Sequence, residues 1–527
     1  YQIIYPELAY SLPIVDLSSY SEKEKTNRVE QIITDEAQTP FSLSDAPLYR
    51  LKLLKINPNE HIFILVMHHI LSDGWSMGVL IRETVQVYHD LQNGTPISLN
   101  ELSIQYADFA VWQQNWLRGD VLDKQLDYWR TQLGDQHPIL ALPTDHPRPA
   151  LRKGRGGSYY FEFPETIGSA IRHLSDIEGV TLFISLLTAF IVLLYRYADQ
   201  DEIRVGTPIA GRTRKEVEGL IGFFVNTIVI QADISGNPTF KELLTRVREV
   251  AVGAYSHQDL PFETLVQELQ PDRDMSIPPL FQVMFSLQNA PGEVWELPGL
   301  EVSNVAVHSA TAKFDLSVIL YENASSETGS TLGGIVEYDL DLFEASSIER
   351  MMNHYRVLLE GVTNNPDKPI MEQPLMMEEE LSQLLVDWNN NIDQYPFGKS
   401  PRTECIHQIF ESQVEKTPDH IAAVYKGEEI SFEVLNQKAN QVAWYLRECG
   451  VGPDTLVGLC VERSINQLVG LFAILKAGGA YVPLDPAYPV DRLSYMIEDA
   501  GLQLLVTQES VLVQLQEIDL NDQTKDH

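Results

Sequence analysis

Short apolar runs alternate with amphipathic stretches along most of this chain. The runs at residues 62–67, 281–285 and 314–320 are rich in β-branched and aromatic residues, which predicts buried strands. A longer apolar run at residues 182–195 is too short to span a bilayer, so it predicts a buried helix. Strands interspersed with helices in this way indicate the α/β class.

Two amphipathic stretches follow the first of these strands. Residues 76–91 predict one helix, and residues 106–133 predict a long amphipathic segment. The second stretch carries Trp112, Trp116 and Trp129. Core packing is the favoured interpretation of these tryptophans.

Changes in composition suggest two boundaries. Residues 142–157 are rich in proline, arginine and glycine, which predicts a solvated linker between two lobes at about 1–150 and 151–375. Residues 376–404 begin with consecutive glutamates and predict a second linker. Short strands then alternate with helices through residues 405–527, which predicts a further α/β domain.

The most informative local pattern follows the first buried strand. His68 and His69 come directly after the apolar run, and Asp73 and Gly74 follow four and five residues after His69. Successive side chains of a strand point to opposite faces, so one imidazole can face a cavity while the other packs into the protein. Three interpretations remain open from these residues alone: one catalytic histidine with a structural neighbour, a purely structural pair, and a metal site. The metal site is disfavoured, because adjacent side chains diverge and no cysteine lies nearby.

Charge and cysteine content narrow the classes of partner and compartment. The formal net charge of the 527 residues is −36, which makes nucleic acid and anionic membranes poor partners. The only cysteines are Cys405, Cys449 and Cys460, and their spacing predicts neither a zinc motif nor a disulfide framework. No signal segment opens the sequence. A reducing cytoplasm is therefore the expected location.

Five further motifs appear in order after the histidine pair. They are VGTPIAGR at 205–212, IGFFVNT at 221–227, HQDLPFE at 257–263, RDMS running on to PLFQ at 273–282, and KFDL at 313–316. Together with the pattern His-His-x-x-x-Asp-Gly, they resemble the condensation domains of nonribosomal peptide synthetases. Chloramphenicol acetyltransferase shares a shorter form of the histidine motif.

The resemblance implies a fold, a reaction and partners. Two chloramphenicol-acetyltransferase-like lobes should form a V with a central channel. The reaction should be amide bond formation between an upstream aminoacyl or peptidyl thioester and the α-amine of a downstream aminoacyl thioester. The expected partners are upstream and downstream peptidyl carrier domains, each with a phosphopantetheine arm, and other modules of the same synthetase. The condensation domain itself should bind no cofactor.

Roles for individual residues follow from the same resemblance. His69 is expected to accept a proton from the attacking amine or to position that amine, and the backbone N–H of Gly74 is expected to meet the oxyanion. His68 should be a packed neighbour. Asp73 should be structural and paired with an arginine, for which Arg273 is a candidate. Trp75, Ser76 and Asn226 are candidates for lining the channel, with a structural role for Asn226 equally favoured.

The C-terminal part resembles the beginning of an adenylation domain of the acyl-adenylate-forming family. The motifs are ISFEVLN at 430–436 and LKAGGAYVPLDP at 475–486. The second motif predicts a helix end, a Gly-Gly stop and a strand bounded by proline. No phosphate-binding Gly/Ser/Thr-rich loop follows Arg492, so this domain is expected to be incomplete and inactive here. ATP and Mg²⁺ are expected to bind only to the complete adenylation domain.

Other functions stay open beside this one. An epimerization domain shares the histidine motif, although the adenylation-like sequence downstream disfavours it. A non-catalytic module that docks carriers is a second alternative. The residues flanking the histidine motif look most like the subtype that joins two L-configured residues. The first two motifs of the family are not found, and the chain is expected to be a piece of a larger protein that lacks N-terminal elements of the first lobe.

Overall fold

The computed structural model divides the chain into two compact units, residues 1–389 and 390–527. It describes residues 2–5, 10–269, 274, 276–288, 297–305, 311–325, 329–389 and 405–515.

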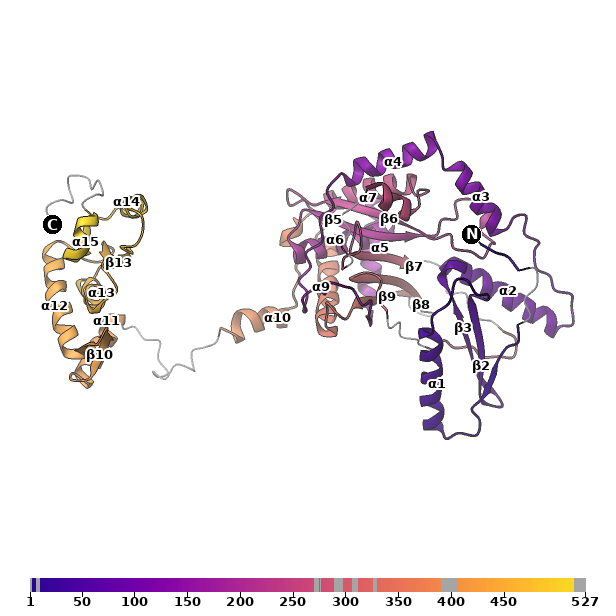
Figure 1. Cartoon of the computed structure of the whole chain (residues 1–527), viewed down its shortest axis with the longest axis horizontal. Helices are drawn as coiled ribbons and strands as arrows, with labels where there is room; N and C mark the ends of the chain where they lie inside the picture. The colour runs from indigo at the N-terminus through magenta and orange to yellow at the C-terminus, as the bar shows by residue number, and fades with distance from the viewer. Residues whose placement is uncertain are drawn as a thin grey trace. The chain divides into compact units, whose positions relative to one another are not determined.

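The first lobe of the first unit is small and lies beside the larger second lobe (Figure 1). Its elements are β1 (Ile14–Asp16), α1 (Glu22–Gln38), β2 (Tyr49–Asn57), β3 (Glu60–Met67), a 3-10 turn η1 (His69–Leu71) and α2 (Gly74–Gln92). The strands form a sheet in the order β1-β2-β3, in which β1 is parallel and β3 antiparallel to β2. Leu17, Leu54 and Ile56 form its buried core.

The second lobe is built on a six-stranded mixed sheet in the order β4-β9-β8-β7-β5-β6. Its strands are β4 (Gly156–Glu162), β5 (Glu202–Ile209), β6 (Asn226–Asp233), β7 (Val283–Gln288), β8 (Leu316–Ser325) and β9 (Gly329–Asp339). Its helical elements are α3 (Tyr106–Trp116), α4 (Asp120–Leu133), α5 (Glu165–Glu178), α6 (Leu182–Ala198), η2 (Lys215–Val217), α7 (Phe240–Ser256), α8 (Phe262–Leu269), α9 (Ala345–Asn364) and η3 (Ile370–Glu372). This mixed α/β architecture agrees with the fold class expected from the sequence.

Helix α6 is the centre of the second-lobe core. Phe190 of α6 stacks on Phe285 of β7 at 5.1 Å, and Tyr355 of α9 donates a hydrogen bond to the carbonyl of Leu186 at 2.8 Å. Eleven consecutive residues of α6, from 184 to 194, are buried. Within the described residues no single helix meets the length and hydropathy needed to cross a bilayer, and α5 with α6 does so only as a pair bent by 107°.

Helix α4 precedes the predicted lobe boundary near residue 150 but packs into the core of the second lobe. The stretch 106–133 is two helices, separated by Gly119 at φ 54°. Trp129 of α4 is 2% exposed in the second-lobe core, and its indole N–H donates to the carbonyl of His257 at 3.0 Å. Core packing therefore holds for Trp129, whereas Trp112 and Trp116 are half-buried and stack on each other at 5.2 Å.

The arginines of the predicted interlobe linker are fastened to the second lobe by ion pairs. Arg148 donates to both oxygens of Asp315, Arg152 donates to Asp339 at 2.9 Å, and Arg155 pairs with Asp341. The Asp315 and Asp339 side chains are 3% and 2% exposed. Most of this segment is exposed, but three of its arginines balance carboxylates of the second lobe.

The second predicted linker begins with structure that belongs to the first unit. Helix α10 (Glu378–Ser382) continues into a π-helical turn, η4 (Gln383–Asp387). The Oε2 atom of Glu380 lies 2.7 Å from Nε2 of His354 on α9, whose side chain is 7% exposed. Met377 and Glu380 thus contact the lobe before them, whereas residues 381–389 are exposed except for the half-buried Leu384. Residues 390–404 lie outside the described part.

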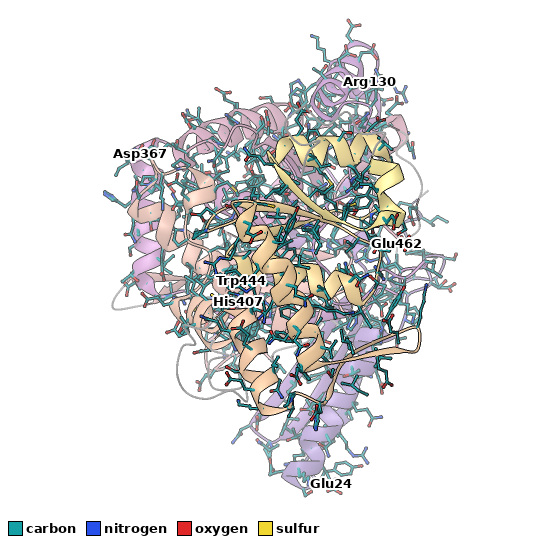
Figure 2. All side chains as sticks on the ribbon, turned by 90° about the vertical axis from the view of Figure 1, so that its left-hand side faces the viewer. Glu24, Arg130, Asp367, His407, Trp444 and Glu462 are labelled. Atoms are coloured by element: carbon teal, nitrogen blue, oxygen red, sulfur yellow. The ribbon has the colours of Figure 1, made fainter. Side chains whose placement is uncertain are left out.

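The second unit confirms the strand and helix alternation expected there. Its elements are α11 (Ile406–Lys416), β10 (Ile421–Tyr425), β11 (Glu428–Ser431), α12 (Phe432–Glu448), β12 (Leu456–Cys460), α13 (Ile465–Ala477), β13 (Ala480–Pro483), α14 (Val490–Asp499), β14 (Leu504–Thr507) and α15 (Glu509–Leu515). A parallel sheet has the order β13-β12-β14, and β10 pairs with β11. Gly478 ends α13 at φ 96°, as the Gly-Gly stop predicts. Two side chains of this unit are labelled in Figure 2: the exposed Trp444 on α12 and the half-buried His407 on α11.

Candidate active site

The histidine pair lies just beyond the end of β3. The His68 N–H donates to the carbonyl of Leu48 at 2.9 Å, and its Nδ1 accepts from the N–H of Ile70 at 3.1 Å. Its ring meets Phe41 edge-on at 6.0 Å. His68 therefore caps the 3-10 turn that carries its neighbour.

His69 begins that 3-10 turn and is exposed. Its ring meets the ring of Phe223, from the second lobe, at 5.2 Å and an interplanar angle of 89°. Among the described residues its imidazole has no hydrogen-bond partner. The two histidines thus face different aromatic residues, and His69 is the one available to a substrate.

Both carboxylate oxygens of Asp73 accept hydrogen bonds from backbone N–H groups. Oδ1 accepts from the N–H of Ser76 at 2.8 Å, as the N-cap of α2, and Oδ2 accepts from the N–H of Phe224 at 2.9 Å. Arg212 lies 3.3 Å from Oδ1, and its side chain is 1% exposed. Burial alone would raise the pKa of Asp73, but these hydrogen bonds and the Arg212 charge lower it overall.

Asp73 is paired with an arginine, as expected from the sequence, and that arginine is Arg212 instead of the candidate Arg273. Arg273, the candidate, lies outside the described residues. Arg212 belongs to the motif at 205–212, which marked the residue without assigning it a role. It is separated from Asp73 by 139 residues along the chain, a contact that no local pattern reveals.

Ser76 joins the two lobes through its hydroxyl group. It is fully buried; its hydroxyl donates to the carbonyl of Gly222 at 2.8 Å and accepts from Arg212 at 2.7 Å. Trp75 is 46% exposed, and its indole N–H donates to the carbonyl of Glu218 at 2.9 Å. The first turn of α2 is thereby fixed to the second-lobe segment between β5 and β6.

The side chain of Asn226 is hydrogen-bonded at both its amide nitrogen and its oxygen. Its amide N–H groups donate to the carbonyls of Gln258 and Leu260 at 2.8 and 2.7 Å, and its oxygen accepts from the N–H of Phe262 at 3.0 Å. These bonds hold the turn that precedes α8 against the start of β6. The polar atoms of the side chain are therefore committed to this turn.

Gly74 is the first residue of α2 and is exposed. A Cβ built on it would meet nothing within 4 Å. The first N–H groups of a helix have no partner inside the helix, so this one is open to a ligand. Over the described residues no group of three or more His, Cys, Asp and Glu side chains is placed to hold a metal ion.

Comparison with known families decides what this site belongs to. The sequence model described as "Condensation domain" matches residues 1–385. This chain belongs to the condensation-domain family. A second model, described as "AMP-binding enzyme", matches residues 410–527, so a condensation domain is followed here by AMP-binding sequence of a nonribosomal peptide synthetase.

Curated relatives of the condensation domain and its AMP-binding extension are long synthetases. The chain is 44% identical over 518 residues to a linear gramicidin synthase of Brevibacillus parabrevis, covering 98% of this chain and 10% of the relative. It is 40% identical to malpinin synthetase of Mortierella alpina, covering 98% and 6%. The chain therefore spans a small part of the length of these relatives.

Solved structures agree with this assignment. A four-domain nonribosomal peptide synthetase bound to AMP and glycine aligns with 96% of this chain and 38% of its own, at a TM-score of 0.71 and 26% identity. The X-domain from teicoplanin biosynthesis, in complex with OxyB, aligns with 72% of this chain and 82% of its own at a TM-score of 0.64. At 24% identity that second likeness shows the fold alone.

Proposed function

We propose that the condensation domain joins two carrier-bound substrates through an amide bond, with His69 at the reacting centre. The observation that carries this proposal is that the residues of the histidine motif differ in burial and in bonding. Asp73 and Ser76 are buried in contacts between the lobes, whereas the imidazole of His69 is exposed beside them. An exposed imidazole on a fixed turn is suited to proton transfer.

The reaction balances without a redox partner. The nitrogen of the acceptor α-amine bonds to the donor carbonyl carbon, the carbon–sulfur bond breaks, and the thiol of the upstream carrier is regenerated with a proton from the amine. An α-amine has a pKa of about 7.7–8.0 in solution, so most of it is protonated at neutral pH. His69 either accepts the proton of the attacking amine or positions the amine. Holding both tethered reactants between the lobes lowers the entropic part of the barrier.

The N-terminus of α2 supplies the second element of the proposed chemistry. The exposed N–H of Gly74 is assigned to the oxyanion that forms as the thioester carbonyl is attacked. Its position, five residues after His69, places it on the same turn-to-helix junction. A channel between the lobes, shaped in part by the exposed Trp75, belongs to the same proposal.

The partners and cofactors follow from the proposed reaction. Upstream and downstream peptidyl carrier domains present the substrates on phosphopantetheine arms, within a multimodular protein, and the condensation domain binds no cofactor of its own. ATP and Mg²⁺ serve the complete adenylation domain. We also infer a reducing, cytoplasmic compartment, since Cys405, Cys449 and Cys460 are unpaired thiols.

The preferred subtype joins two L-configured residues. The basis is the sequence around the histidine motif, and the AMP-binding match after residue 410 disfavours the epimerization alternative. Reconstitution tests these interpretations together. The chain, joined to its neighbouring domains, is mixed with a donor carrier loaded with either an L- or a D-aminoacyl group and with a loaded acceptor carrier.

Each product identifies one function. A dipeptidyl thioester formed faster from the L-donor supports the proposal. Faster use of the D-donor overturns the L-to-L assignment only. Inversion of one loaded residue without a new amide bond identifies an epimerization domain. Carrier binding with no chemistry identifies a docking module.

A further inference from the structure

Three consecutive residues of the second lobe, 222–224, are held by the side chains of Asp73 and Ser76 from the first lobe and of Tyr106 from α3. Ser76 Oγ donates to the Gly222 carbonyl at 2.8 Å and accepts from the Gly222 N–H at 3.1 Å. The Tyr106 hydroxyl donates to the Phe223 carbonyl at 2.9 Å. Asp73 Oδ2 accepts from the Phe224 N–H at 2.9 Å. The backbone of residues 222–224 is therefore fixed at every residue.

Close packing adds to these hydrogen bonds. A Cβ built on Gly222 would lie 2.2 Å from Cδ2 of Tyr106, so the ring of Tyr106 lies directly against this backbone. The ring of Tyr106 also meets Phe224 edge-on at 5.1 Å. Burial and the Asp73 carboxylate raise the pKa of Tyr106, which keeps its hydroxyl protonated as a donor.

The side chain between these anchors points at the proposed catalytic residue. Phe223 is 37% exposed, and its ring is the one that meets His69 edge-on at 5.2 Å. In a Ser-His-Asp triad a carboxylate orients the imidazole. Here the nearby carboxylate of Asp73 is occupied by Ser76, Phe224 and Arg212.

We propose that Phe223 orients the His69 imidazole by ring-edge contact, and that Tyr106 fixes Phe223 through its carbonyl. Both are positioning residues, and their importance for turnover rests on the proposed function of His69. The Phe223 ring restricts the His69 imidazole to few rotamers, while both nitrogens of the imidazole remain free for the substrate. The three interlobe hydrogen bonds that Ser76 and Asp73 make with Gly222 and Phe224 set the distance between the Phe223 ring and His69.

A spectroscopic experiment tests the orientation without any turnover. The whole chain is labelled with ¹³C-histidine, and the ring signals of His69 are identified by their loss in His69→Gln. Phe223→Leu removes the ring current and should displace these signals, whereas Phe223→Tyr keeps the ring and should leave them near their wild-type positions. Trp112→Leu is the matched control, because Trp112 contacts Phe109, Trp116 and Arg214 instead.

A kinetic experiment tests the consequence in the reconstituted synthetase. Phe223→Leu should lower kcat roughly three- to tenfold, the range that corresponds to one aromatic pair, with little change in the KM for the loaded acceptor carrier. Tyr106→Phe should lower kcat in the same direction by less, since it keeps the ring and loses one hydrogen bond. Phe223→Tyr should restore most of the activity.

The outcomes separate this inference from the proposed function. Unmoved His69 signals in Phe223→Leu, with a wild-type melting temperature, overturn the ring contact. Moved signals with unchanged kcat overturn its role in turnover. If wild-type protein makes no amide product, the proposed function fails, while the displaced signals still establish how His69 is oriented. Should Phe223→Leu fail to fold, Phe223→Met replaces it as the variant that removes the ring, with the same displacement of the His69 signals expected.

Discussion

The guanidinium of Arg212, from the second lobe, lies 3.3 Å from the carboxylate of Asp73 in the first, and the two side chains are 1% and 3% exposed. Removing one charge leaves the other buried and unpaired, which costs about 3–5 kcal/mol. We therefore expect Asp73→Asn to lower the free energy of unfolding by about that amount. Denaturant unfolding of the chain measures it.

An exposed ion pair provides the control for this variant. Arg130 and Glu268 are 3.0 Å apart with side chains 52% and 41% exposed, so Arg130→Gln should cost at most about 1 kcal/mol. If Asp73→Asn is as stable as Arg130→Gln but has lost condensation activity, Asp73 acts in the chemistry and its structural assignment is wrong.

The contribution of Asp73 to stability should depend on pH in acid. Its pKa is lower in the folded protein than in the unfolded chain, where an aspartate titrates near about 3.9. The stabilisation is therefore complete above that pH and disappears as the pH falls through the lower folded value. The stability difference between wild type and Asp73→Asn should be constant at neutral pH and shrink below about pH 4. A difference that persists unchanged to about pH 2 would contradict a lowered pKa.

His69 should matter to rate and leave folding untouched. His69→Ala is expected to slow condensation by about 10²-fold or more, the range for a positioned proton acceptor. Because the side chain is exposed and without a hydrogen-bond partner in the described structure, the melting temperature should stay at the wild-type value. Single-turnover product formation with preloaded carriers checks the first expectation. Wild-type rates there would remove His69 from the mechanism.

The end of the first unit can be tested by truncation. A chain that stops at residue 389 keeps Glu380, whereas one that stops at 375 leaves His354 without it. Burial raises the pKa of Tyr197 to about 12, so its hydroxyl stays protonated where it lies 2.7 Å from Nδ1 of His354. Glu380 is the partner of the other ring nitrogen, Nε2. Losing Glu380 should cost about 1–3 kcal/mol. Glu380→Gln in the longer chain keeps a hydrogen-bond acceptor, so its melting temperature should lie between those of the two truncated chains. Equal melting temperatures of the two truncated chains would place the boundary at 375.

The 527-residue polypeptide should show no ATP–pyrophosphate exchange with any amino acid. The motivating observation is that no phosphate-binding loop follows Arg492 in its sequence. Exchange above that of a boiled sample would show that the AMP-binding part activates substrate in this form. A synthetase in which the adenylation sequence continues is the positive control.

Local sequence patterns predicted the elements better than their partners. The predicted strand at 62–67 and the predicted helix at 76–91 lie inside β3 and α2. They could be predicted because strand and helix periodicity depends on residues close together in the sequence. The exposed His69 could be singled out for the same reason. Arg212 could not, since its contact with Asp73 crosses 139 residues and only the folded chain brings them together.

The partners of the two predicted linkers could not be read from the sequence for a related reason. Residues 142–157 have the proline, glycine and arginine content of a solvated segment, but the buried carboxylates that hold Arg148 and Arg152 lie 167 and 187 residues further on. The consecutive glutamates after residue 377 looked like a polar spacer, although Glu380 is the partner of a nearly buried histidine. The charge of a side chain does not reveal whether that side chain is solvated or paired with an opposite charge elsewhere in the fold.

The placement of α4 limits how such domains can be recombined. A crossover near residue 150 would bring Trp129 from one parent into a core formed by the other, where it must fit the carbonyl of His257 and the packing around it. A crossover between β5 and β6 would separate Arg212 from the Phe224 backbone that shares its partner Asp73. Functional chimaeras should therefore inherit residues 1–389 from a single parent, and exchanges of synthetase modules should place their junctions after that point.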